Sequence, residues 1–163
     1  MDEKQSQKIY SFDIYMLEQL KKLLFSTYSP QDKIWLFFSL FDKGGKLLAS
    51  HGVVKSDKPL ETMLDLLYTG IIKTHEATVQ DVVFDIVEDI QIQKDISAFL
   101  QLSPVEYGVL LEEMDGTKSG VLLPNMVGIQ TMQQALATIK KKYELWGNVT
   151  ISTFKTKRII FSK

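Results

Sequence analysis

Apolar residues in the first third of the chain are spaced in two different ways. Helical spacing predicts an amphipathic helix over 12–26, with Ser11 as its N-cap and an end before Pro30. The most apolar stretch predicts a strand over 33–41 that is buried on both faces or nearly so, and residues 46–54 predict a second strand. The segment therefore begins as one helix followed by two strands.

The connections around these strands carry turn residues. Asp42-Lys43-Gly44-Gly45 predicts a hairpin, because paired glycines supply the positive φ that such turns need. Pro59 then begins a helix that runs to about Thr74. A long strand is predicted over 81–93 from its alternation of period two, which is typical of a half-buried antiparallel strand. Its apolar face comprises Val82, Phe84, Ile86, Ile90 and Ile92. Glu88 interrupts that face, and we expect a bulge or strand end to return it to water.

The second half of the chain repeats this mixture of elements. In order, the pattern predicts a short helix over 96–102, strands over 107–112 and 119–123 joined by a hairpin, a helix from Thr131 that closes at Gly147, and a strand over 149–161. Thr131 and Gln134 have the spacing of a capping box. Because strands follow one another through tight hairpins, the predicted fold class is α+β, with a mostly antiparallel sheet and flanking helices. We expect a single domain over 1–163, with a polar tail over 1–10.

Composition narrows the function classes. A share of 45% hydrophobic residues in 163 is typical of a globular domain, and a net charge of −1 excludes a globally basic nucleic-acid binder. The chain has no cysteine, which excludes disulfides, thiolate zinc sites and cysteine nucleophiles. No spacing of metal ligands and no cofactor motif occurs, so we expect neither a metal nor a cofactor. The first ten residues lack the apolar region of a secretory signal, and no apolar run is long enough to cross a membrane, so we expect a cytoplasmic protein without membrane contact.

Several segments resemble one known family. They are KLLASHG (46–52), PLETMLDLL (59–67), YGVLLE (107–112) and SGVLLP (119–124). Over about 12–161 the chain resembles the AMME-syndrome candidate-region protein family, known in prokaryotes as protein A of the AmmeMemoRadiSam system. The resemblance implies a two-lobed α+β domain around a cleft, with no established activity. It also implies Memo-like and radical SAM proteins as partners in a modification pathway.

The chain departs from the family at its signature. Where the family has L-R-G-C-I-G, residues 47–52 are LLASHG, so that Ser50 replaces the signature cysteine and Leu48 the arginine. The scaffold is thus expected to be retained while the site is altered. This favours a non-catalytic accessory protein that binds a small ligand or a partner in the cleft, with Ser50, His51 and Gly52 as the candidate binding residues.

Two alternative functions remain open. One is a small enzyme built around Ser50 and His51, although adjacent strand residues point to opposite faces, which places His51 badly as a base for Ser50. The other is a phosphate or RNA binder, since residues 131–163 hold seven basic side chains and one acidic one. Its candidate residues are Lys141, Lys155, Lys157 and Arg158.

Overall fold

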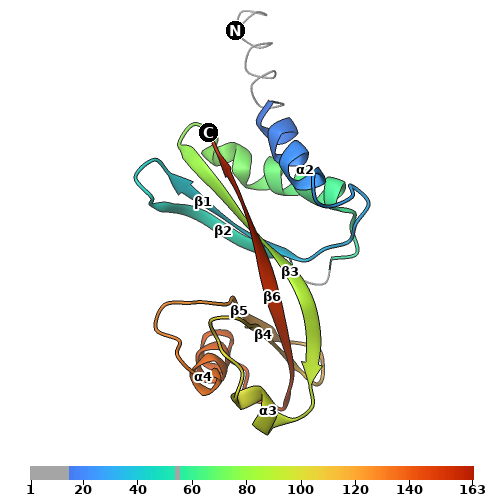
Figure 1. Cartoon of the computed structure of the whole chain (residues 1–163), viewed down its shortest axis with the longest axis vertical. Helices are drawn as coiled ribbons and strands as arrows, with labels where there is room; N and C mark the ends of the chain where they lie inside the picture. Colours follow the sequence, from blue (N-terminus) through green and yellow to red (C-terminus); the bar gives the residue numbers. More distant parts are fainter. Residues whose placement is uncertain (1–14, 54–55) are drawn as a thin grey trace, which may run out of the picture. The chain divides into compact units, whose positions relative to one another are not determined.

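The computed structural model of the protein describes residues 15–53 and 56–163, which form two compact units (Figure 1). Unit 1 comprises the described residues up to Ile86 together with Arg158–Lys163, and unit 2 comprises Val87–Lys157. The predicted polar tail over 1–10, the predicted N-cap Ser11 and the end of the second predicted strand at residue 54 lie outside the described residues.

Six strands form one sheet in the order β2-β1-β3-β6-β4-β5. They are β1 (Leu36–Asp42), β2 (Leu47–Val53), β3 (Val79–Gln93), β4 (Gly108–Glu113), β5 (Ser119–Leu122) and β6 (Val149–Ser162). The pairs β1–β2, β1–β3, β4–β5 and β4–β6 are antiparallel. Together with the helices, this confirms the α+β class and the mostly antiparallel sheet. The neighbouring strands β3 and β6 each contribute residues to both units.

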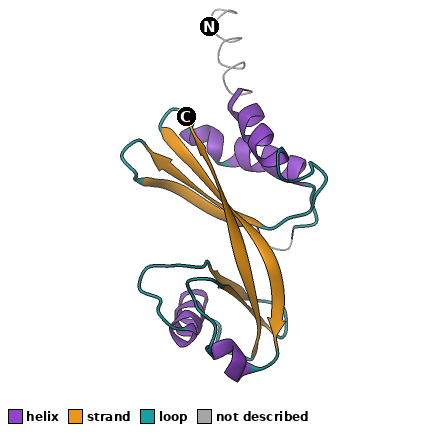
Figure 2. Ribbon diagram, viewed as in Figure 1, coloured by secondary structure: helices purple, strands orange, loops and turns teal. Residues whose placement is uncertain are grey.

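In unit 1, the helix over 15–25 and α2 (Leu60–Gly70) cover one face of the strands (Figures 1 and 2). Their buried residues pack with those of the strands in one core: Leu20, Leu24, Leu60, Leu64, Leu36, Phe38, Leu40 and Phe84. The helix predicted to reach Thr74 is α2 followed by a 3₁₀ turn, η1 (Ile72–His75). The predicted hairpin is closed by an Asx turn at Asp42. The Asp42 Oδ1 atom accepts hydrogen bonds from the N–H groups of Gly44 and Lys46, both at 2.9 Å.

In unit 2, α3 (Ile96–Leu100) and α4 (Met132–Tyr143) pack against β4 and β6 through a second core (Figure 2). Its fully buried members are Phe99, Val109, Leu111, Met132, Ala135, Ile139 and Leu145. The predicted capping box at the start of α4 is confirmed, with Thr131 and Gln134 bonded to each other's backbone. The predicted closure at Gly147 is wrong, because α4 ends at Tyr143 and its C-cap is Glu144, which takes the left-handed conformation at φ 56°.

Strand β3 differs from its predicted half-buried pattern. Residues 82–87 are buried on both faces, whereas residues 88–92 are exposed, including Ile90 at 43% and Ile92 at 62%. The register with β1 ends at Ile86, so that the last part of β3 loses a neighbouring strand. Asp89 takes a left-handed conformation with φ 52°, which disturbs the alternation next to Glu88. Glu88 is exposed, as predicted.

Within the described part of the chain, no helix has both the length and the apolar character needed to cross a membrane.

Candidate functional site

Strand β2, which carries Ser50, His51 and Gly52, lies at the edge of the sheet, and all three residues are exposed. The register places Ser50 opposite Ser39, His51 opposite Phe38, and Gly52 opposite Phe37. Because Phe38 is 1% exposed and belongs to the core under the helices, His51 lies on the helix-covered face. Its ring centroid is 6.3 Å from that of Phe38.

Ser50 and Gly52 lie on the other face of the sheet. Neighbours along a strand alternate between faces, so Ser50 and His51 point away from each other. The geometry therefore does not place the imidazole where it can take a proton from the Ser50 hydroxyl.

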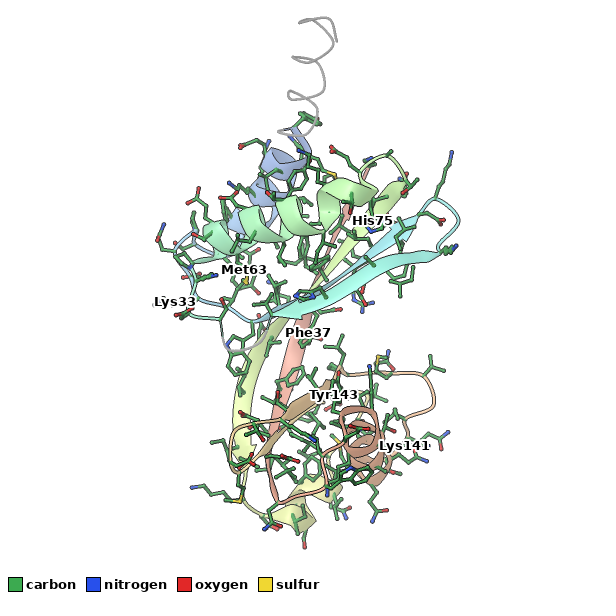
Figure 3. All side chains as sticks on the ribbon, turned by 180° about the vertical axis from the view of Figure 1, so that it is seen from behind. Lys33, Phe37, Met63, His75, Lys141 and Tyr143 are labelled. Atoms are coloured by element: carbon green, nitrogen blue, oxygen red, sulfur yellow. The ribbon has the colours of Figure 1, made fainter. Side chains whose placement is uncertain are left out.

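Gly52 allows an aromatic ring to lie close to the strand. A Cβ atom at this position would be 2.3 Å from Cε1 of Phe37, which is far inside van der Waals contact. Phe37 is labelled on its strand in Figure 3. The glycine therefore has a steric role, and the half-buried Phe37 ring takes the space that a side chain at Gly52 would fill.

Beyond Phe37 on the same face, a buried carboxylate holds an exposed guanidinium. The register pairs Phe37 of β1 with Asp85 of β3, whose side chain is 8% exposed. Asp85 accepts two hydrogen bonds from Arg158 of β6, from Nε to Oδ1 at 2.9 Å and from Nη2 to Oδ2 at 3.2 Å. The Arg158 side chain is 63% exposed. The hydrogen bonds to Asp85 raise the pKa of Arg158, so this side chain remains a cation.

We call this set of residues the outer face of unit 1: Ser39, Ser50, Gly52, Phe37, Asp85 and Arg158. It crosses four neighbouring strands in the order β2-β1-β3-β6. Three strand spacings of about 4.8 Å give roughly 14 Å between the backbones of β2 and β6. The structure thus brings two predicted residues, Ser50 and Gly52, onto one face with a third, Arg158. It adds Phe37 and Asp85, which the sequence did not identify as site residues.

The predicted basic patch is divided among several surfaces. Lys155 lies over the Tyr107 ring at 5.2 Å, on the side of β6 that faces the unit 2 core. Strand alternation places Lys157 on that side and Arg158 on the opposite one, where it binds Asp85. Lys141 is exposed on α4 (Figure 3). These four cations do not form one continuous surface along β6.

Metal ligands are not gathered in the part of the chain that the structure describes, where no cluster of three His, Asp or Glu side chains occurs.

Comparison with known proteins reports on the fold alone. No family model and no curated protein sequence matches the chain. Among solved structures, an uncharacterised protein from Pyrococcus horikoshii is similar, with a TM-score of 0.62 and 15% sequence identity over 82% of this chain and 80% of that chain. At this identity the likeness supports the α+β architecture and carries no information about activity.

Proposed function

We propose that the protein is a non-catalytic binding protein that holds a small anionic ligand, with a phosphate or carboxylate group, on the outer face of unit 1. The observation that carries this proposal is the Asp85–Arg158 pair, in which the acceptor is buried and the donor is exposed.

The pair prepares Arg158 for a ligand. A guanidinium has five N–H donors in a rigid plane, and Asp85 occupies only one edge of that plane. Asp85 holds the Arg158 side chain in one rotamer. An anion that binds the remaining N–H groups therefore does not have to order this side chain, which lowers the entropic cost of binding. Asp85 also cancels the net charge locally, so selectivity is expected to come from paired, directional hydrogen bonds. The hydroxyl groups of Ser39 and Ser50 lie on the same face, on strands β1 and β2, and are too far from Arg158 to contact the same anionic group.

A binding function fits the geometry better than an enzymatic one. A serine nucleophile requires a base within hydrogen-bond reach and a group that orients the base. Ser50 and His51 lie on opposite faces of β2, so the pair lacks the first requirement.

We extend the proposal to the cellular role through the family resemblance. The chain is proposed to act in the cytoplasm as an accessory protein of a radical-SAM-associated modification pathway, with Memo-like and radical SAM proteins as partners. Purified Memo-like and radical SAM proteins from the same genome provide the test, and calorimetric titration should detect binding to at least one of them. Absence of binding to both would remove the pathway role and leave the anion site to be judged separately.

The anion site is tested by titrating inorganic phosphate and acetate while the backbone amide resonances around Asp85 and residue 158 are followed by NMR in each protein. We expect saturable shifts in the native protein and their loss in Arg158→Lys, which keeps the charge but not the planar donor fork. Lys157→Gln is the matched control, because Lys157 neighbours Arg158 on the opposite face of β6. Equal shifts in the Arg158→Lys protein and the native one, or no saturation in either, would overturn the proposal.

A further inference from the structure

Arg158 has an exposed apolar neighbour on the outer face of unit 1. Ile159 and Phe161 of β6 pack against the unit 1 core, so alternation along the strand places Ile160 on the same face as Arg158. Residues two apart on a strand are separated by about 7 Å. Ile160 is 54% exposed. The guanidinium therefore has beside it, on the same face, an apolar side chain that water reaches.

Two side-chain contacts show how β3 and β6 run past each other in unit 1, where they are neighbours in the sheet (Figure 1). Asp85 accepts its hydrogen bonds from Arg158, and Asp81, four residues earlier on β3, accepts one from the Ser162 hydroxyl at 2.6 Å. Ser162 follows Arg158 by four residues on β6. The two strands are therefore antiparallel here, with the same register at both contacts.

Val83 adds a second apolar side chain to this surface. It lies midway between the two aspartates on β3, so the register places it opposite Ile160, which lies midway between the two donors on β6. Val83 is 9% exposed and pairs with Ser39 of β1, which also lies on the outer face. A ligand on this surface would meet Arg158 through an anionic group and the two apolar side chains through hydrocarbon.

We infer that the ligand of the Arg158 site is an amphipathic monocarboxylate, whose carboxylate binds the guanidinium and whose hydrocarbon group packs on Ile160 and Val83. This inference rests on the proposed anion binding and adds the ligand class, an aromatic or branched-chain carboxylate. The planar donor fork of arginine matches the two oxygens of a carboxylate. Asp85 disfavours a second negative charge nearby, so a monoanion fits better than a phosphate dianion.

The hydrocarbon group supplies the affinity that the neutral ion pair does not. Burial of apolar surface is favourable in proportion to its area, and the exposed part of Ile160 is the surface that a ligand can cover. A carboxylate with one attached ring spans roughly the 7 Å between positions 158 and 160. Benzoate is therefore a suitable probe, and acetate is its counterpart without the hydrocarbon group.

Parallel titrations with acetate and benzoate, followed by NMR, test the inference. Benzoate should bind the native protein about fivefold more tightly than acetate, because its ring covers apolar surface that acetate leaves in water. Ile160→Ser should bring this ratio to about one and leave the acetate affinity unchanged. Leu66→Ser is the matched control, since Leu66 is 53% exposed but belongs to α2, on the other face of the strands. It should leave the ratio unchanged.

Intermolecular NOEs give a second readout that needs no variant. The ring protons of bound benzoate should show NOEs to the methyl groups of Ile160 and Val83, and none to those of Leu66. NOEs to other methyl groups in place of these two would overturn the inference even if benzoate binds more tightly than acetate.

The outcomes separate this inference from the proposed function. Equal, saturable binding of acetate and benzoate would overturn the ligand class and leave the anion site intact, as would tighter binding of inorganic phosphate than of benzoate. A ratio that Ile160→Ser leaves unchanged, or that Leu66→Ser lowers equally, would also overturn the ligand class alone. Saturation by none of these anions in the native protein would overturn the anion site and this inference with it.

Discussion

Gly108 and Gly52 each lie beneath an aromatic ring, but the two rings differ in their freedom to move. A Cβ at Gly108 would be 2.3 Å from Cζ of Phe154 and 2.9 Å from the Leu122 carbonyl oxygen. Phe154 is 2% exposed, so its ring cannot turn away, whereas the half-buried Phe37 above Gly52 can. We predict that Gly108→Ala lowers the free energy of unfolding by about 2–3 kcal/mol and Gly52→Ala by about 1 kcal/mol, measured by urea denaturation.

Gly70→Ala is the control for this comparison. Gly70 ends α2 and has no atom within 4 Å of its would-be Cβ, so alanine should be neutral or stabilising by up to about 1 kcal/mol. An equal loss in all three variants would contradict steric overlap as the cause, because alanine at Gly70 meets no atom.

Replacing Arg158 should lower the stability of the protein more than replacing its partner, Asp85. Arg158→Gln leaves a buried carboxylate without its cation, whereas Asp85→Asn leaves a guanidinium that is 63% exposed to water. We expect Arg158→Gln to lower the free energy of unfolding by about 2 kcal/mol and Asp85→Asn by about 1 kcal/mol, after allowing for the exposure of Arg158. The double variant should be more stable than Arg158→Gln alone. Equal costs for the two single variants would contradict the burial difference.

At this scale the sequence identified Arg158 as a candidate binding residue but did not identify its partner, Asp85. Asp85 lies inside VVFDIV, and a carboxylate in so apolar a run needs a cation or a proton. The pairing cation is 73 residues away, and only the β3–β6 neighbourhood selects Arg158 among the basic residues. Arg158 was predicted as a binding residue within a basic patch, but its partner and its face follow from strand register. Phe37 was missed because its ring lies over a glycine on another strand.

At the scale of elements, the start of α4 depends on its capping box. Thr131 Oγ1 accepts a hydrogen bond from the Gln134 N–H at 3.1 Å. We predict that Thr131→Ala lowers the free energy of unfolding by about 1 kcal/mol, measured by urea denaturation, because the first turn loses this acceptor. Gln133→Ala, at an exposed position in the same turn, should have almost no effect. A larger loss for Gln133→Ala would contradict the assignment of the cap.

The β4–β5 hairpin carries a pH-dependent turn. Asp115 accepts hydrogen bonds from the Thr117 backbone N–H at 3.0 Å and from its hydroxyl at 2.8 Å, and these bonds lower the pKa of Asp115 below 3.8. Since the folded state holds this carboxylate ionised, its contribution is present above the unfolded pKa and is lost as pH falls through the folded value. The stability difference between the native protein and Asp115→Ala should therefore shrink below about pH 4. A constant difference down to about pH 2 would contradict it.

The periodicity of apolar residues predicts where helices and strands lie in the sequence, but it does not predict the residues at which they end. The spacing of apolar residues located all six strands, yet α4 ends at Tyr143, four residues before the predicted Gly147. Leu145 explains this: it is fully buried, and its N–H bonds to the Lys140 carbonyl at 2.9 Å. To bury Leu145, the chain must turn at Glu144, which accepts a left-handed conformation despite its side chain. Burial of one residue thus outweighs the local preference for glycine.

At the scale of the whole molecule, basic residues are concentrated in the C-terminal segment of the sequence. In the structure, however, their side chains contact different partners and lie on different surfaces. Seven basic side chains and one acidic one fall in residues 131–163. Among the described residues, Lys155 lies over Tyr107, Lys142 lies over Tyr143, and Arg158 binds Asp85. Linear charge density therefore overstates the positive potential that a ligand would meet on any one surface.

This arrangement predicts weak binding of RNA. The affinity of a single strand depends on how many phosphates are neutralised together, with a slope of about −0.7 per phosphate in a plot of log K against log salt. Because alternation along β6 separates Lys155 and Lys157 from Arg158, we expect a slope no steeper than about −1.5, or two phosphates, for a fluorescent single-stranded RNA in anisotropy titrations. Lys155→Gln combined with Lys157→Gln should reduce this slope, and Arg158→Lys should not change it. A slope of about −3 or steeper would mean that four or more cations act together, and it would favour nucleic-acid binding over the small-anion site.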